Sequence, residues 1–256
     1  MDKVRAKKHL GQHFLKDESI AKRIADSLLG ETSVLEIGPG MGVLTKYLKD
    51  TSAVKALKLV EIDSESVVYL NENYPELKQD IISGDFLKMD LNGIFPSSYA
   101  IMGNFPYNIS NQILFKVFDN HDKINQVVGM FQKEVAERVV APSGSKTYGI
   151  LSVLLSAYYS GEYLFTVSED VFSPPPKVKS AVIRLVRNTT TQLDCDENLF
   201  VRIVKTAFNQ RRKMLRSSLK PLNMSLANIE ESLLTKRAEQ LSLEQFIHIT
   251  KNINHD

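Results

Sequence analysis

Short apolar runs alternate with stretches of helical periodicity over the first 140 residues of the chain. The runs are rich in Val, Ile and Leu, which is typical of buried strands. We expect strands over residues 33–37, 56–63, 80–87, 98–102 and 125–131. Apolar side chains at three- and four-residue spacing predict helices over residues 17–30, 43–49, 64–74, 108–120 and 133–140. Strands that alternate with helices predict an α/β fold, in which a parallel sheet carries helices on both faces.

The pattern changes in the second half of the chain. Residues 162–168 and 177–186 flank the proline-rich segment 173–177, and they predict two paired strands at a sheet edge. After them, a polar linker leads into helical periodicity without strand alternation. We therefore predict two domains, an α/β domain over residues 1–188 and a small all-α domain over residues 189–256.

Composition narrows the class of protein. Of the 256 residues 43% are hydrophobic, which is enough for a buried core. The single cysteine, Cys195, excludes an internal disulfide and a cysteine-based zinc cluster, so we expect a reducing compartment and no metal. The longest apolar stretch, residues 148–159, is shorter than the roughly 20 residues of a membrane span, and the N-terminus lacks a secretory signal. We expect a soluble, cytoplasmic monomer that does not bind membranes.

Positive charge gathers in two segments, although the formal net charge is only +2. Residues 1–16 contain five basic side chains and one acidic one, and residues 201–220 contain seven basic side chains and no acidic one. Two basic segments on an otherwise acidic chain suggest a polyanionic partner. A solvated face or a flexible end would produce the same pattern, and for either segment alone the sequence leaves both interpretations open.

A glycine turn follows the first predicted strand of the sheet. In EIGPGMG (residues 36–42), Gly38 and Gly40 let the backbone approach a ligand that a Cβ atom would block. The dinucleotide fingerprint needs a further glycine at its sixth position, where this chain has Val43. A nucleoside without a pyrophosphate is therefore the better candidate ligand.

Two acidic residues follow the next two strands. Glu61 can accept hydrogen bonds from both ribose hydroxyls, and Asp85 can accept one from an adenine amine or cap a turn. The carboxyl ends of parallel strands meet at one edge of the sheet, where α/β folds bind ligands. Adenosine without pyrophosphate, bound at a glycine turn, indicates S-adenosylmethionine as the cofactor.

A rigid loop, GNFPYNIS (residues 103–110), follows the fourth strand. The side-chain oxygen of Asn104 and the backbone carbonyl of Pro106 can accept the two N–H bonds of an aromatic ring amine such as adenine N6. Tyr107 offers a face for base stacking, worth about 1–3 kcal/mol. The loop could also be a simple strand-terminating turn, but its position after the glycine turn and both acidic residues favours a site that holds a base.

Nine segments together resemble the KsgA-type ribosomal RNA adenine dimethyltransferases, in family order and over nearly the whole chain. They are GQHFL (11–15), EIGPGMGVLT (36–45), VEID (60–63), GDFL (84–87), GNFPYNIS (103–110), FQKEVAERV (131–139), YGILSV (148–153), FSPPPKVKSAV (172–182) and AFNQRRKMLRSSL (207–219). The NFPYNIS and PPPKV segments are the most specific of these.

The resemblance implies a fold, a reaction and a substrate. The fold is that of class I S-adenosylmethionine-dependent methyltransferases, a Rossmann-like, seven-stranded, mostly parallel sheet whose last strand is antiparallel, with a C-terminal helical domain that binds ribosomal RNA. The reaction is the dimethylation of N6 on each of two adjacent adenosines. These lie in a hairpin near the 3′ end of 16S ribosomal RNA, within an assembling small ribosomal subunit.

The resemblance also assigns residues by position. Phe172 matches an aromatic residue on the far side of the target base from Tyr107. The family usually has Asn where this chain has His13, and Leu where it has Phe105; the second change preserves bulk and should matter little. The cofactor residues are His13, Leu15, Gly38, Gly40, Glu61, Asp85 and Asn104. The residues expected to bind RNA are Lys7, Lys8, Arg211, Arg212, Lys213 and Arg216.

Three other functions remain as alternatives. The large-subunit (23S) ribosomal RNA adenine methyltransferases that confer macrolide resistance share the Asn-x-Pro-Tyr loop, although the predicted basic helix NQRRKMLRSSL (209–219) argues against them. A nicotinamide oxidoreductase would need the missing glycine. A ribosome-assembly factor with a vestigial pocket would bind the subunit whether or not Asn104 were intact.

Overall fold

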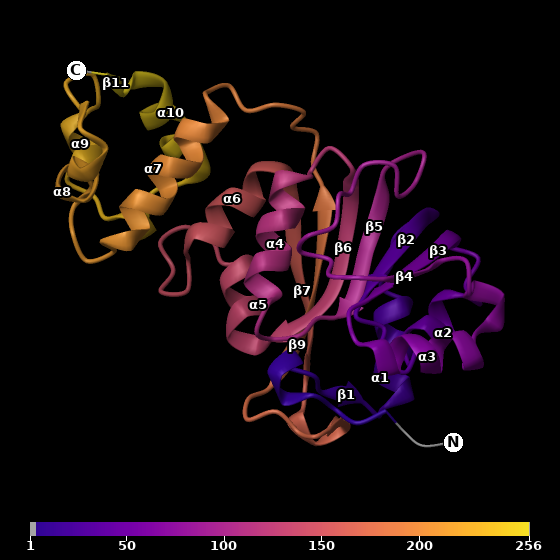
Figure 1. Ribbon diagram of the computed structural model, residues 1–256. Coiled ribbons are helices and arrows are strands. Elements are labelled where there is room, and N and C mark those ends of the chain that lie inside the picture. The colour runs from indigo at the N-terminus through magenta and orange to yellow at the C-terminus, as the bar shows by residue number, and fades with distance from the viewer. Residues whose placement is uncertain (1–3, 256) are drawn as a thin grey trace. The chain divides into compact units, whose positions relative to one another are not determined.

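The computed structural model describes residues 4–255, which form two compact units (Figure 1). The first comprises the chain up to Ala136 together with Gly161–Arg187, and the second comprises Glu137–Ser160 together with the chain from Asn188. Residues 137–160 therefore group with the C-terminal stretch, although they precede the predicted boundary. A separate domain over residues 189–256 stays a prediction.

Seven strands form one sheet in the order β4-β3-β2-β5-β6-β9-β7, which confirms the predicted class I arrangement. The neighbours from β4 to β6 are parallel, and β9 is antiparallel to β6. The central strand β5 buries its first five residues, as its run of apolar side chains predicts. The strands are β2 (Thr32–Ile37), β3 (Val54–Glu61), β4 (Ile81–Ser83), β5 (Tyr99–Asn104), β6 (Ile124–Gln132), β7 (Tyr159–Val167) and β9 (Ser180–Arg187).

Helices cover both faces of this sheet. From β2 the chain passes to β3 and then to β4, toward one edge of the sheet. From β5 it passes to β6, toward the opposite edge. Right-handed crossovers therefore place α2 and α3 on one face and α4 on the opposite face (Figure 1). The helices are α1 (Glu18–Ala25), α2 (Thr45–Leu48), α3 (Ser64–Asn73), α4 (Ser110–Asp119) and α5 (Lys133–Val139).

Helix α1 begins where the sequence predicts and ends five residues early. Asp17 caps it by accepting hydrogen bonds from the amides of Ser19 and Ile20. It ends at Ala25 rather than at Gly30, because the amides of Ser27 and Leu28 donate to the carbonyls three residues earlier instead of four. The hydroxyl of Ser27 donates to the carbonyl of Arg23 at 2.7 Å, and the amide of Leu29 donates to Gln126 of β6 at 3.0 Å.

The described part of the second unit is built mainly from helices, and the short strands β10 and β11 pair within it. Within this unit α7 packs against α6 and α10, and Phe208 of α7 lies 6.0 Å from Tyr148 and 6.1 Å from Phe246 between ring centroids. Its elements are α6 (Ile150–Tyr158), α7 (Glu197–Asn209), α8 (Leu215–Ser218), α9 (Glu231–Leu234) and α10 (Leu243–Asn252), with β10 (Met224–Ser225) and β11 (Asn254–His255).

The predicted basic helix over residues 209–219 is wrong, because the chain turns between α7 and α8. Gln210 leaves the helical conformation at φ −118° and ψ 46°. The four residues that follow Asn209 are all polar, so a helix there would have no apolar face to bury. Met214 instead pairs with Arg237 in an isolated antiparallel bridge.

Short elements complete the described chain, in which no helix is long and apolar enough to cross a membrane. Strand β1 (Phe14–Leu15) pairs with β8 (Phe172–Ser173), so the N-terminal segment lies against the proline-rich segment. The 3₁₀ helices are Lys8–Leu10, Pro75–Leu77, Glu169–Val171, Lys220–Leu222 and Ala238–Gln240.

One aromatic ring holds the start of the Asn-Phe-Pro-Tyr loop against the sheet. Gly103 of β5 and Gly129 of β6 are register partners, and the buried ring of Phe105 covers both. A Cβ atom on Gly129 would lie 2.0 Å from the nearest ring carbon of Phe105. The two glycines therefore form a slot for the ring, and Phe131 packs beside it at 4.9 Å between centroids.

We expect Gly129→Ala to lower the free energy of unfolding by about 1–3 kcal/mol, because the new methyl group overlaps the ring of Phe105. Phe105→Leu in the same chain should recover most of that loss, since leucine has no atoms at the outer ring positions. Chemical denaturation of the two single variants and the double variant tests this coupling. A double variant no more stable than Gly129→Ala would contradict it.

Candidate functional site

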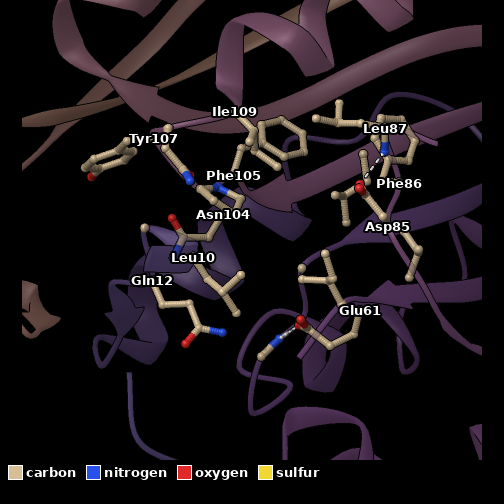
Figure 2. Close-up of a pocket in the computed structure, with 18 of the residues that line it drawn as sticks. Leu10, Gln12, Glu61, Asp85, Phe86, Leu87, Asn104, Phe105, Tyr107 and Ile109 are labelled. Carbon is tan, nitrogen blue, oxygen red and sulfur yellow. Dashed lines mark hydrogen bonds between the residues drawn. The ribbon is translucent and has the colours of Figure 1, made fainter. Parts of the chain in front are cut away.

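A cavity lies at the carboxyl ends of the parallel strands (Figure 2). Figure 2 shows Asn104 and Tyr107 on one side of it and Glu61 and Asp85 on the other. Its walls come from the ends of β2 and β3, the loops that follow β4 and β5, and residues 10–14. Most residues predicted from the sequence therefore meet here: His13, Gly38, Gly40, Glu61, Asp85, Asn104, Pro106 and Tyr107.

The glycine turn is tied to β3 through the carboxylate of Glu61. The amide of Gly40 donates to Oε2 of Glu61 at 2.9 Å, and the amide of Asp63 donates to Oε1 at 2.9 Å. Gly40 adopts φ 56°, and a Cβ atom there would lie 2.9 Å from the ring of Phe14. Burial raises the pKa of Glu61, whose exposed fraction is 3%, while the two amides oppose that shift.

A second carboxyl group, Glu36, is buried beneath the same turn. The hydroxyl of Thr45 donates to its Oε2 at 2.7 Å. Burial raises the pKa of Glu36 to about 8, the negative charge of Glu61 adds to this shift, and the Thr45 hydrogen bond opposes it. Glu36 also lines a smaller cavity that adjoins the main one, together with Leu15 and Met41.

The loop after β4 carries Asp85 and is held by a lysine that the sequence did not indicate. Oδ1 of Asp85 accepts a hydrogen bond from the amide of Leu87 at 2.9 Å, which makes it a turn cap as well as a cavity residue. Nζ of Lys116, on α4, donates to the carbonyl of Leu87 at 3.1 Å and to that of Met89. Desolvation lowers the pKa of this amine. A single lysine in an amphipathic helix gives no sequence signal for this role.

The carboxamide of Asn104 has a defined orientation. Its Nδ2 donates to the backbone carbonyl of His13 at 2.9 Å. Its Oδ1 has no hydrogen-bond partner among residues 4–255, and the residue lines the cavity. The carbonyl of Pro106 accepts one hydrogen bond, from the amide of Ile109 at 3.2 Å, and keeps a second lone pair. The loop thus presents two neutral acceptors.

The ring of Tyr107 is held at its hydroxyl and on one face. The hydroxyl hydrogen-bonds to Ser180 of β9, and His13 stacks on the ring at 5.3 Å between centroids. Phe172, the predicted second aromatic residue of the base site, is 1% exposed in the core and does not line the cavity. A role for Phe172 beside the base stays a prediction.

The charge of the cavity suits a cationic nucleoside better than a dinucleotide. Glu61 and Asp85 are among its lining residues, and Ile62 and Phe86 provide apolar wall. Among the described residues that line it, none is lysine or arginine, the side chains that most often bind a pyrophosphate. The described residues also contain no cluster of three or more side chains that could hold a metal ion.

The basic residues predicted to bind RNA differ in their availability. Lys7 forms ion pairs with Asp63 and Glu65, whereas Lys8 is exposed. In the second unit, Arg211 pairs with Glu239 and Arg216 pairs with Glu231. Arg212 and Lys213 are exposed, and within the described part of the chain neither has an acidic partner.

Comparisons with known proteins agree on one family. The family model "Ribosomal RNA adenine dimethylase" matches residues 3–255. The chain is 60% identical to "Ribosomal RNA small subunit methyltransferase A" of Flavobacterium johnsoniae, over all of this chain and 98% of that protein.

Solved structures show the same fold. A dimethyladenosine transferase from Plasmodium falciparum matches with a TM-score of 0.76 and 25% identity, covering 93% of this chain and 96% of that one. The 23S rRNA methyltransferase ErmE matches with a TM-score of 0.68 and 23% identity, covering 93% and 99%. The second likeness concerns the fold alone.

Glu36→Gln should change how stability depends on pH. The pKa of Glu36 in the folded protein is raised to about 8, whereas in the unfolded chain the carboxyl group loses its proton near its ordinary pKa of 4.5. The folded state therefore binds more protons between these values, and this group makes stability fall as pH rises across that window. We expect the melting temperatures of the two proteins to agree near pH 5 and that of Glu36→Gln to be higher at pH 8. Parallel curves over this range would contradict the assignment.

Lys116→Met should weaken cofactor binding without unfolding the protein. It removes two hydrogen bonds to the Asp85 loop, so we expect the Kd for S-adenosylmethionine to rise about tenfold. Lys123→Met is the matched control, because Lys123 follows the same helix and its ion pair is with Asp122 alone. Calorimetric titration measures both, and equal affinities would show that the loop holds its shape without Lys116.

Proposed function

Because this chain belongs to the ribosomal RNA adenine dimethylase family, we propose that it dimethylates N6 of two adjacent adenosines in small-subunit (16S) ribosomal RNA, with S-adenosylmethionine as the methyl donor. The observation that carries the proposal is the side-chain oxygen of Asn104, which has no hydrogen-bond partner within the described residues and is held at the cavity wall by the bond from its own nitrogen to His13. The adenosines would lie in a hairpin near the 3′ end of that RNA.

The cofactor supplies an electrophilic methyl group on a sulfonium. Glu61 is placed to accept the ribose hydroxyls, and its hydrogen bond from Gly40 holds the glycine turn against the same ligand. Oδ1 of Asp85 caps its turn, and Oδ2, which lies 3.7 Å from Nζ of the exposed Lys88, would accept the adenine amine. The positive charge of the sulfonium fits a cavity whose charged lining residues are acidic.

Asn104 and Pro106 would orient the target amine. The lone pair of an adenine N6 is delocalised into the ring, so the amine is a poor nucleophile. Two neutral oxygens that accept its N–H bonds align it and return electron density to the nitrogen. Acceptors without formal charge do this without placing an anion against the base. The proton can leave to water after methyl transfer, so no general base is needed.

Tyr107 would stack on the base, and its surroundings limit where the base lies. Its hydroxyl bond to Ser180 restrains the ring, and His13 already covers one face at 5.3 Å, too close to admit a base between the two rings. The target base therefore uses the other face of Tyr107 or displaces the imidazole. Either way, the stacking surface is held in place before RNA arrives.

The substrate in the cell would be an assembling small subunit, bound by a monomeric enzyme in the cytoplasm. The small-subunit assignment is supported by the name of the 60%-identical relative. A large-subunit adenine methyltransferase is the second candidate, favoured only by the fold shared with the 23S enzyme. Mass spectrometry of ribosomal RNA from cells with and without the gene tests both: dimethyladenosine should disappear from 16S RNA and not from 23S RNA.

Asn104→Ala should abolish methylation, because the variant loses the acceptor for the target amine. Its affinity for S-adenosylmethionine should stay within about tenfold of the native value, since this contact serves the base more than the cofactor. Methyl incorporation into purified small subunits and calorimetric cofactor binding measure the two effects. Unchanged turnover would rule out the proposed role of Asn104.

A further inference from the structure

The imidazole of His13 makes two contacts beside the loop that would hold the target base. Its Nδ1 lies 2.8 Å from the carbonyl oxygen of Pro174. Because a carbonyl oxygen only accepts hydrogen bonds, Nδ1 carries the hydrogen and donates it to Pro174. The ring also stacks on Tyr107, with 5.3 Å between the centroids and 29° between the planes. The ring of His13 therefore links the N-terminal segment to the proline-rich segment and to the loop after β5.

The main chain of His13 is held as well. Its carbonyl accepts the hydrogen bond from Nδ2 of Asn104 at 2.9 Å. The next residue, Phe14, pairs with Ser173 of β8, and Pro174 follows Ser173 in the sequence. The backbone thus fixes where the side chain begins, and the bond to Pro174 fixes where the imidazole lies. The ring therefore has a defined position before any base arrives.

Tyr107 needs a second restraint besides its hydroxyl bond. The hydroxyl oxygen hydrogen-bonds to Ser180, a buried residue of β9. That oxygen lies on the axis about which a tyrosine ring rotates, so the bond fixes the end of the ring and leaves its plane free to turn. The stack on His13 restrains the plane, because a quarter turn would bring the edge of the ring against the imidazole. The two restraints together define both the position and the tilt of the ring.

The same contact decides which face of Tyr107 a base can use. The two rings are too close to admit a base between them. A base that took the place of the imidazole would have to break both the stack and the bond to Pro174. Within residues 4–255 no other aromatic ring contacts Tyr107, and the residue lines the cavity. Stacking on the face opposite His13 therefore breaks neither of these contacts.

We propose that His13 is a positioning residue for the target adenine: its ring fixes the plane of Tyr107, and the base stacks on the opposite face, with N6 at the two acceptor oxygens of the loop. The inference rests on the proposed function, since the base is the substrate of that reaction. His13 acts here through Tyr107 and not through the cofactor. A tilted ring would carry N6 away from its acceptors, so the loss falls on the rate of methyl transfer rather than on binding.

Two variants separate the ring from the hydrogen bond. His13→Phe keeps an aromatic face and loses the bond to Pro174, whereas His13→Asn keeps a side-chain donor and loses the ring. Methyl transfer is measured at saturating S-adenosylmethionine on purified small subunits that lack the dimethyl groups. We expect kcat to fall about three- to tenfold in His13→Asn and less than about threefold in His13→Phe. The Kd for S-adenosylmethionine and the KM for subunits should stay within about twofold in both.

Fluorine NMR follows the contact without the reaction. The protein is labelled with 3-fluorotyrosine, and the signal of Tyr107 is the one that disappears in Tyr107→Phe. It should move in His13→Asn, because the neighbouring ring is lost. His9→Ala is the control: His9 is an exposed histidine of the same segment, and its loss should leave both this signal and kcat near their native values.

Three results would overturn the proposal: native kcat in His13→Asn, equal losses of kcat in His13→Asn and His13→Phe, or a Kd for S-adenosylmethionine raised about tenfold with kcat unchanged. The second would assign the effect to the bond with Pro174, and the third would make the side chain a cofactor contact. In each case methylation by the native protein leaves the proposed function standing. If native protein transfers no methyl group while the Tyr107 signal still moves in His13→Asn, the proposed function fails and the restraint on Tyr107 stands.

Discussion

The orientation of one carboxamide governs what the cavity can do. Asn104 presents an oxygen to the cavity because its nitrogen is taken by the carbonyl of His13, 91 positions earlier in the chain. A flipped amide would aim a donor at the same space and repel an amine. The N-terminal segment is therefore part of the site: it supplies wall at residues 10–14, and it also orients the carboxamide on which the proposed chemistry would depend.

Several features of the fold make that orientation possible. Phe105, the next residue in the sequence, is buried in the slot over Gly103 and Gly129. Its ring therefore fixes the position at which the loop leaves the sheet. The sheet hydrogen bonds of β5 and β6 reach as far as Asn104 and Met130. This edge of the sheet is thus held in place where the base would bind, and in the proposed reaction the two acceptors would meet the substrate already aligned. Preorganisation of this kind lowers a barrier without any charged catalytic group.

Much of the first unit could be predicted from sequence, because its signals are local. The glycine turn, the acids that follow β3 and β4, and the loop after β5 each stand directly after an apolar run, and parallel strands bring such positions to one edge. The roles of Lys116 and Ser180 could not be predicted. Lys116 donates to the backbone carbonyl of Leu87 in the loop after β4, and Ser180 hydrogen-bonds to the hydroxyl of Tyr107, which is 73 residues away in the sequence. Contacts of that kind leave no periodic trace in a sequence.

Charge in the second unit was harder to interpret. A run of cations such as Arg211 to Lys213 looks uniform in sequence, yet the fold pairs the first with Glu239 and leaves the next two exposed. The helix expected there is a turn, since polar residues give a helix nothing to bury. Composition therefore indicates a polyanionic partner, whereas only the fold separates cations that hold the protein together from those that face outward.

The pairing of β1 with β8 bears on how the enzyme is made. Phe14, from the cavity wall, lies opposite Ser173, and β9, which supplies Ser180 to Tyr107, enters the sheet between β6 and β7. A chain emerging from its own ribosome cannot form these two contacts until about 180 residues have been synthesised, however early the glycine turn forms. The contacts that restrain Phe14 and Tyr107 therefore form only after more than two thirds of the 256 residues have been made, and a shorter product would carry the glycine turn without them.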